Sequence, residues 1–256
     1  MQRIIYAGDS TVTFNHIATY PQTGLSQGLS LYVKDDVFIR SFAINGRSTK
    51  SFIDQGRLQA VDQYLMPGDF LFIQFGHNDE KMSDPLRYAD PHTDYRENLK
   101  KFVETARKHD AVPVLISPIA RRLFDAAGKF LPGSHGEYPK ACRAVAEETG
   151  TAFIEMTEAS ENYLEMLGDF ASRPLYVYPK DNSHLTAQGA AVMAGFLADG
   201  LLKLGSPYSD LLVPRDAKVI DEDDAPALQP YMVQARGEAF SDPTLNLDAF
   251  KNEKQD

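Results

Sequence analysis

The run of residues 69–75, DFLFIQF, constrains the fold more than any other stretch of this chain. Nearly all of its side chains are apolar, without the alternation expected of a strand that has one face in water. Such a run is typical of a central parallel strand that helices cover on both faces. Other strand-like segments lie at residues 3–7, 37–43, 112–117 and 152–156.

Helix-like segments separate these strands. The spacing of apolar residues predicts helices at 26–33, about 49–64, 93–109, 140–149, 157–167 and 186–204. Polar segments at 81–93, 119–139 and 168–182 are expected to be loops. The regular alternation of strand and helix predicts an α/β fold, a three-layer α/β/α sandwich of flavodoxin-like type with about five parallel strands.

The last part of the chain differs in composition from the rest. Residues 206–256 contain several prolines, the acidic run DEDD at 221–224 and a charged terminus. We therefore expect one domain at 1–205 and a C-terminal extension at 206–256 that has no core of its own. The extension could dock on the domain, for example through 228–233, be exchanged with a partner in a homodimer, or be partly disordered.

Charge and cysteine content exclude several classes of protein. The net charge of -10 comes from 26 basic and 36 acidic residues, and it argues against nucleic acid or an anionic membrane as a partner. The single cysteine, Cys142, cannot form an intramolecular disulfide and fits a reducing compartment. The start of the chain lacks the apolar region of a signal peptide, and no apolar run reaches the ~18 residues of a membrane span. We expect a cytoplasmic protein.

Four loops carry residues that are suited to nucleophilic catalysis. Ser10 follows the first strand, Gly46 the second and Asn78 the third, while Asp181 and His184 precede the last helix. Carboxyl ends of parallel strands meet at one edge of a sheet, so these loops should lie together. Each motif alone has a plainer reading as a helix cap or turn. Together they provide a nucleophile, a base, an orienting carboxylate and oxyanion donors.

These motifs also resemble those of a known family. GDST at 8–11, NGRS at 45–48, FGHND at 75–79 and DNSH at 181–184 resemble, in order, the four blocks of the SGNH (GDSL) hydrolase superfamily. The closer resemblance is to its rhamnogalacturonan acetylesterase branch, in which a threonine is common where this chain has Ser183. The resemblance covers roughly residues 3–200 and implies an SGNH hydrolase fold; it does not extend to the C-terminal extension.

The resemblance implies a role for each residue. Ser10 would attack an ester carbonyl, His184 would act as general base and then as general acid, and Asp181 would orient His184. The backbone N–H groups of Ser10 and Gly46 and the side-chain amide of Asn78 would form the oxyanion hole. The spacing of Asp181 and His184 agrees with this, because a carboxylate three residues before an imidazole can accept from one of its ring nitrogens.

Candidate substrate contacts are less well defined by the sequence. They are Asp9, His77, Arg121, Arg122 and His135. Arg121 and Arg122 follow the fourth strand, where one of them could bind a substrate carboxylate such as that of a galacturonate, or both could be an ordinary surface pair. His77 could shape the site or be structural.

The sequence thus predicts a carboxylic ester hydrolase that needs no metal or cofactor, because it lacks metal-ligand spacing and a phosphate-binding glycine loop. We expect a serine carbohydrate esterase that removes O-acetyl groups from small pectin-derived, rhamnogalacturonan-type oligosaccharides. One alternative is an SGNH esterase acting on another acetylated glycan, a short-chain ester or a thioester. A second is a non-catalytic carbohydrate-binding module with the same fold.

Overall fold

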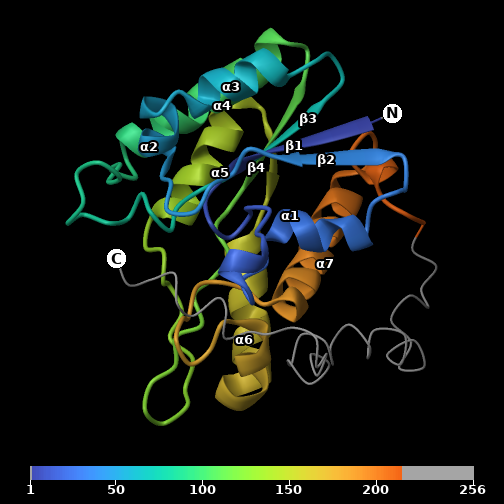
Figure 1. Cartoon of the computed structure of the whole chain (residues 1–256). Helices are drawn as coiled ribbons and strands as arrows, with labels where there is room; N and C mark the ends of the chain where they lie inside the picture. Colours follow the sequence, from blue (N-terminus) through green and yellow to red (C-terminus); the bar gives the residue numbers. More distant parts are fainter. Residues whose placement is uncertain (1, 215–256) are drawn as a thin grey trace, which may run out of the picture. The chain divides into compact units, whose positions relative to one another are not determined.

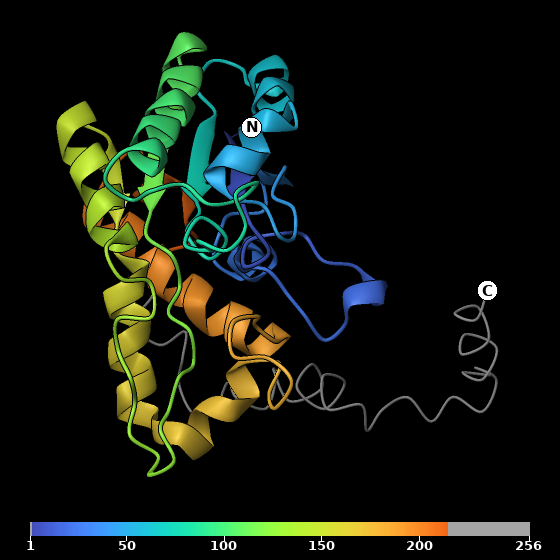
Figure 2. The same ribbon diagram turned by 90° about the vertical axis from the view of Figure 1, so that its left-hand side faces the viewer.

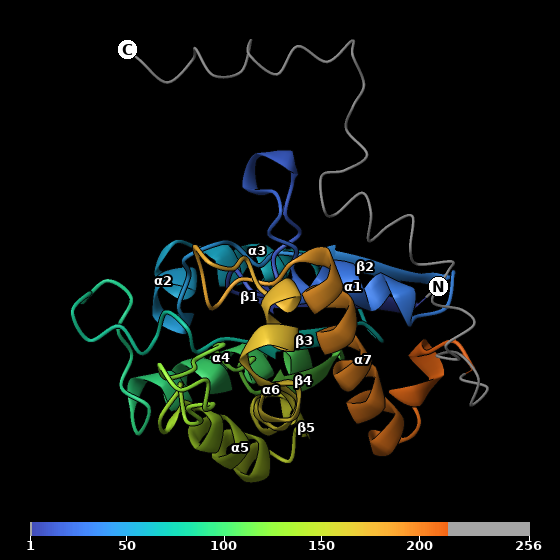
Figure 3. The same cartoon turned by 90° about the horizontal axis from the view of Figure 1, so that it is seen from below.

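Five parallel strands form a single sheet at the centre of the fold (Figure 1). The computed structural model describes residues 2–214 of the chain. The strands are β1 (Gln2–Gly8), β2 (Val37–Ser41), β3 (Phe70–Gln74), β4 (Val112–Ile116) and β5 (Ala152–Ile154). Their order is β2-β1-β3-β4-β5, and every pairing is parallel, as Figure 3 lets the reader follow. The predicted flavodoxin-like fold with about five parallel strands is confirmed, and the observed order is the one typical of that fold.

Helices cover both faces of this sheet (Figure 1, Figure 3). They are α1 (Leu25–Gly28), α2 (Thr49–Asp54), α3 (Arg57–Tyr64), α4 (Asp94–Lys108), α5 (Tyr138–Thr149), α6 (Met156–Ser172) and α7 (Ala187–Leu204). Short 3-10 helices are found at Ile17–Thr19, Leu29–Leu31, Arg173–Leu175 and Ser209–Leu211. The segment with Ile17–Thr19, between β1 and α1, extends away from the sheet in Figure 2. The three layers predicted from the alternating pattern are present.

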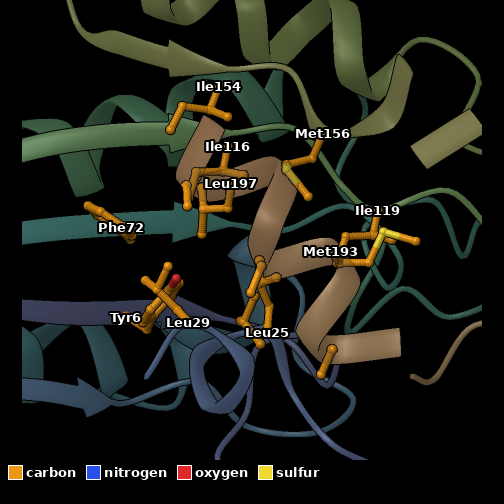
Figure 4. Close-up of a cluster of buried hydrophobic side chains, with 14 of the residues drawn as sticks. Tyr6, Leu25, Leu29, Phe72, Ile116, Ile119, Ile154, Met156, Met193 and Leu197 are labelled. Atoms are coloured by element: carbon orange, nitrogen blue, oxygen red, sulfur yellow. The ribbon is translucent and has the colours of Figure 1, made fainter. Parts of the chain in front are cut away.

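Two hydrophobic cores separate the sheet from its helix layers. All five residues of β3 are buried, and its four apolar residues alternate between the cores: Phe72 enters the core under α1, α6 and α7, and Ile73 enters the core under α2 to α5. Figure 4 shows the first core, in which Leu25 of α1 and Leu197 of α7 pack with residues of the sheet. A strand that must fill two cores cannot alternate with polar side chains, which explains the apolar run.

Three helices differ from the sequence prediction. The helix expected at about 49–64 is divided into α2 and α3, because Gly56 between them adopts a left-handed conformation with φ of 70°. The helix expected at 26–33 is the single turn α1 followed by a 3-10 turn. The helix expected at 157–167 continues to Ser172 past a non-helical Gly168, so the loop expected at 168–182 begins later.

The compact unit extends beyond the boundary expected at 205, to Pro214. Leu211 and Leu212 are buried in the core, and Leu212 forms an antiparallel bridge with Val33. The remainder of the predicted extension, 215–256, lies outside the described residues, so its docking and any homodimer contact stay predictions. Within residues 2–214, no helix combines the length and apolarity needed to cross a membrane.

Candidate active site

The turn after β1 holds Ser10 at the carboxyl edge of the sheet. Gly8 is the last residue of β1, and a Cβ there would lie 2.2 Å from Val12 Cγ2 and 2.7 Å from the backbone oxygen of Gln74. Only glycine therefore lets the chain turn this tightly against β3. The next residue, Asp9, is fully buried and accepts from the N–H and the hydroxyl of Thr11, at 2.9 and 2.8 Å. These buried contacts hold the turn that carries Ser10 in place.

Ser10, His184 and Asp181 form a continuous hydrogen-bonded chain. Ser10 Oγ lies 2.8 Å from His184 Nε2, and His184 Nδ1 lies 2.7 Å from Asp181 Oδ2. Since Asp181 can only accept when ionised, it fixes the ring tautomer with Nδ1 protonated and leaves Nε2 to accept from the serine. Ser10 and His184 are 174 positions apart in sequence, and the structure brings these three predicted residues together.

Asp181 remains ionised because its second oxygen is also hydrogen-bonded. Its Oδ1 accepts from the backbone N–H groups of Ser183 and His184, at 2.6 and 2.9 Å. Burial alone would raise the pKa of this carboxyl, but the hydrogen bonds from His184 and Ser183 outweigh it, so the pKa lies below its ordinary value. A permanent negative charge is therefore available to stabilise a protonated His184.

Two backbone donors lie at the same edge. Gly46 has φ of 77°, a conformation that side chains other than glycine's rarely adopt, and both Gly46 and Ser10 line the cavity described below. Among the described residues, neither backbone N–H donates to another protein atom. Both are therefore available to a ligand, as an oxyanion hole requires.

The amide of Asn78 is held in one orientation. Its Oδ1 accepts from Lys81 Nζ at 3.1 Å and from Arg87 Nη1 at 3.3 Å, while its Nδ2 donates to the backbone oxygen of Arg47 at 3.1 Å. The two cations exclude the flipped amide, because flipping would point N–H groups at them. The second N–H of Nδ2 is left for another acceptor.

These groups surround one cavity of about 360 Å³. It is lined by Ser10, Gln22, Asn45, Gly46, His77, Asn78, Lys81, Arg87, Arg121, Asp181, Ser183 and His184. Apart from glycine, every lining residue is polar or charged. A cavity of this composition suits a small, hydrogen-bonding ligand better than a long acyl chain.

Of the candidate substrate contacts, His77 and Arg121 line the cavity, whereas Asp9, Arg122 and His135 do not. The guanidinium of Arg122 is bonded to Asp169 and Ser172, and it lies over the rings of Phe124 and Tyr178. The side chain is almost completely buried in these contacts. The prediction of a substrate role for Arg122 is therefore corrected: its position makes it structural.

Asp9 and His135 are also corrected to structural positions, since neither of them lines the cavity. His135 contacts Glu80 Oε2 through Nδ1 at 2.9 Å and the backbone oxygen of Ile119 through Nε2 at 2.8 Å. The other oxygen of Glu80 is bonded to Arg121, which also donates to Ser183 and to the backbone oxygen of His77. Arg121 thus lies at the cavity but has most of its donors engaged.

His77 lies between the cavity and this buried network. Its Nδ1 is 3.5 Å from Asp9 Oδ2, and its ring packs edge-on against His135 with 4.4 Å between centroids. Burial lowers the pKa of His77 to about 4, and the neighbouring His135 contributes in the same direction. His77 is therefore neutral at pH 7, when it can shape the cavity without adding charge.

Sequence reasoning missed several residues of the cavity, namely Gln22, Asn45, Lys81 and Arg87. Gln22 donates to the backbone oxygen of Ser10 at 3.2 Å and so helps to hold the turn that carries this serine. Lys81 and Arg87 belong to the segment 81–93, which was expected to be a loop over this edge. That position was the one sequence feature that could have pointed to them as cavity residues. Within residues 2–214, no group of three or more His, Cys, Asp or Glu side chains is arranged to hold a metal ion.

Comparison with known proteins agrees with this geometry. Residues 6–192 match the GDSL-like Lipase/Acylhydrolase family. The rhamnogalacturonan acetylesterase RhgT of Bacillus subtilis is 35% identical over 84% of this chain and 96% of its own length. The probable rhamnogalacturonan acetylesterase YesY of the same organism is 33% identical over 82% of this chain and 97% of its own length.

A solved structure shows the same fold. The crystal structure of protein YxiM from Bacillus subtilis superimposes with a TM-score of 0.72 and 24% identity, over 80% of this chain and 57% of the YxiM chain. The extent of the family match and the two acetylesterase relatives are sufficient to assign the family. The chain belongs to the GDSL-like lipase/acylhydrolase family, as a carboxylic ester hydrolase of its rhamnogalacturonan acetylesterase-like branch.

Proposed function

We propose that this ester hydrolase is a carbohydrate acetylesterase that removes O-acetyl groups from rhamnogalacturonan-type oligosaccharides derived from pectin. The observation that carries the proposal is the Ser10–His184–Asp181 chain at a cavity with an entirely polar lining. The carbohydrate class and the acetyl group are supported by the relatives, two of which carry rhamnogalacturonan acetylesterase names.

The geometry supports acyl transfer in two steps. Ser10 Oγ attacks the acetyl carbonyl while its proton passes to His184 Nε2, 2.8 Å away. The carbonyl oxygen becomes an oxyanion that the N–H groups of Ser10 and Gly46 and the amide of Asn78 would stabilise. His184 then protonates the departing sugar oxygen, which leaves as a hydroxyl, and the acetyl group stays on Ser10. Water, deprotonated by His184, attacks the acetyl-serine; the bond to Ser10 Oγ breaks, His184 returns the proton to that oxygen, and acetate is released.

Among the alternatives, another acetylated glycan shares every feature of this site and differs only in the sugar. A long-chain ester is disfavoured because the lining offers no apolar side chain for an acyl tail. A non-catalytic binding module is disfavoured because it has no use for a serine, an imidazole and a carboxylate joined within 2.8 Å contacts.

Acetate release tests the proposal directly. Wild type and Ser10→Ala are compared on acetylated rhamnogalacturonan oligosaccharides, acetylated xylan oligosaccharides and the p-nitrophenyl esters of acetate and octanoate. We expect the highest kcat/KM among the sugars on rhamnogalacturonan, preference for acetate over octanoate, and no activity in Ser10→Ala. Equal or faster release from xylan would reject the pectin-derived substrate, and an inactive wild type would favour a binding module.

A further inference from the structure

Two positive side chains converge on the oxyanion edge of the cavity. Lys81 Nζ and Arg87 Nη1 both donate to Asn78 Oδ1, at 3.1 and 3.3 Å, and both residues are half-buried in the cavity wall. Arg87 Nη1 would lie 4.0 Å from a Cβ placed on Gly46. The two cations are therefore next to the place where the acetyl carbonyl would be bound.

One of the cations at this cavity has no carboxylate within ion-pair distance among residues 2–214. The Arg121 guanidinium is bonded to Glu80, and Arg87 Nε is bonded to Asp84 at 2.5 Å. Lys81, by contrast, has no carboxylate partner among residues 2–214; its hydrogen bond goes to the neutral amide of Asn78. In a chain with a net charge of -10, an unpaired cation in the active-site cavity is a local exception.

The surroundings of Lys81 favour a negatively charged ligand. Burial lowers the pKa of its ammonium group, and the repulsion from Arg87 and Arg121 lowers it further, while Asp9 and Glu80 act in the opposite direction without reversing the shift. An anion placed between Lys81 and Arg87 would relieve this repulsion. It would also gain charge-assisted hydrogen bonds, which are stronger than bonds to a neutral hydroxyl.

We propose that Lys81 and Arg87 form a carboxylate-binding subsite that recognises a uronic acid residue of the substrate. This inference rests on the proposed function, which supplies an acetylated sugar, and it adds which side chains select an acidic one. Arg121 and Arg122 were the cations considered from the sequence. Arg122 does not line the cavity, and the bonds of Arg121 to Glu80, Ser183 and His77 leave it less free than Lys81. Lys81 is thus a specificity-determining residue, with Arg87 as its partner.

A competing explanation assigns these cations to the oxyanion hole alone. By holding Asn78 Oδ1 they would polarise the amide and strengthen its N–H donors. That role would affect acidic and neutral substrates equally, whereas a carboxylate subsite discriminates between them. The informative quantity is therefore the ratio of the result for the acidic sugar to the result for the neutral sugar. Any contribution that Lys81 makes through Asn78 affects both sugars equally and does not change this ratio.

The test uses two pairs of sugars that differ only at C6. Galacturonate and galactose are compared as competitive inhibitors of p-nitrophenyl acetate hydrolysis, and their O-acetylated methyl glycosides are compared as substrates. The variants are Lys81→Met, which removes the charge, Lys81→Arg, which keeps it, and Lys140→Met as a matched control. Lys140 is paired with Glu137 on the surface, away from the cavity. Thermal unfolding checks that each variant is folded.

We expect wild type to bind galacturonate about tenfold more tightly than galactose, in line with one charge-assisted hydrogen bond. Lys81→Met should remove most of this preference in both assays, while Lys81→Arg and Lys140→Met should retain it. The preference should also shrink at high salt, because the pair is partly exposed. The proposal is overturned if wild type shows no preference, or if Lys81→Met lowers both members of each pair equally.

The two proposals fail in different ways. If wild type releases no acetate from any acetylated sugar, the proposed function is wrong, and the inhibition ratios still decide whether the carboxylate subsite exists. If acetate is released from acidic and neutral sugars at the same rate in every variant, the deacetylase stands and the subsite is wrong.

Discussion

Asp79 accepts two hydrogen bonds from Thr49, one from its backbone N–H at 2.9 Å and one from its hydroxyl at 2.5 Å. Thr49 is the first residue of α2, just after the loop that carries Gly46, while Asp79 adjoins Asn78. The two side chains are fully buried. This contact therefore ties together the two loops that hold the proposed oxyanion donors Gly46 and Asn78.

Removing the hydroxyl from this contact should loosen both loops. Thr49→Val keeps the backbone bond and the shape but leaves Asp79 with one donor fewer, so we expect a loss of about 1–3 kcal/mol in unfolding free energy. kcat on p-nitrophenyl acetate should fall more than KM rises, since donor spacing matters most in the transition state. Urea unfolding and steady-state kinetics measure the two effects. Unchanged kcat would show that the loops are positioned independently of this contact.

Asp79 should also give the fold a distinctive dependence on pH. Burial raises the pKa of its carboxyl to about 8, above its ordinary value, despite the bonds from Thr49. The native state therefore holds a proton that the unfolded state releases, and the associated stability is lost as pH rises from about 4 toward 8. Asp79→Asn, which is neutral at every pH, should flatten this part of the profile in thermal unfolding. A wild-type profile parallel to that of the variant would contradict the neutral carboxyl.

His77 should make the stability of the fold depend on pH in the opposite direction. Its pKa is lowered to about 4 by burial and by His135, so the native state holds fewer protons than the unfolded state between about 4 and the ordinary value of 6.5. Stability should then fall as pH drops through this window. His77→Gln should remove that dependence, while the exposed His92→Gln serves as the control. The measurement is the melting temperature between pH 4 and 7, and equal slopes in all three proteins would contradict the prediction.

Replacing Asp181 should cost activity without disturbing the fold. Asp181→Asn retains the shape but can present an N–H to His184 Nδ1, which favours the tautomer that cannot accept from Ser10. We expect kcat on p-nitrophenyl acetate to fall about 10³–10⁴-fold. Circular dichroism should show the native fold, and a loss below tenfold would remove Asp181 from the catalytic chain.

Asn78 offers a separate measure of the oxyanion hole. Asn78→Ala removes one donor, and such a loss lowers kcat by about 10²–10³-fold. Asn78→Asp is the sharper variant, because its carboxylate would keep the bonds from Lys81 and Arg87 but repel the oxyanion. We expect it to be less active than Asn78→Ala, as kcat on p-nitrophenyl acetate will show. The reverse order would place Asn78 outside the oxyanion hole.

The parts of this fold that could be predicted from sequence are those in which local pattern and tertiary environment agree. The run ending at Phe75 is apolar because β3 is buried on both faces, and any central strand would show the same pattern. Gly56 was not recognised as a helix break, because a single glycine is tolerated inside a helix and only its left-handed conformation divides α2 from α3.

The candidate site also contains residues that a local sequence pattern could predict and contacts that it could not. Ser10, Asn78 and His184 could be predicted because each lies in a short motif at the end of a strand or the start of a helix. The burial of Arg122 against Phe124 and Tyr178, and the approach of Lys81 to Asn78, could not. These contacts depend on how long loops fold over the sheet edge, which no local pattern records.

The separation of 174 positions between Ser10 and His184 has a consequence for when activity can appear during synthesis and folding. During synthesis Ser10, the proposed nucleophile, emerges before four of the five strands, whereas His184, its proposed base, emerges only after the whole sheet has been made. No nascent or truncated chain that ends before His184 can hydrolyse an ester by this route. Esterase activity is therefore a reporter of complete folding. A chain divided between β4 and α5 would regain activity only when its two fragments associate, which makes the protein suited to a split-enzyme complementation assay.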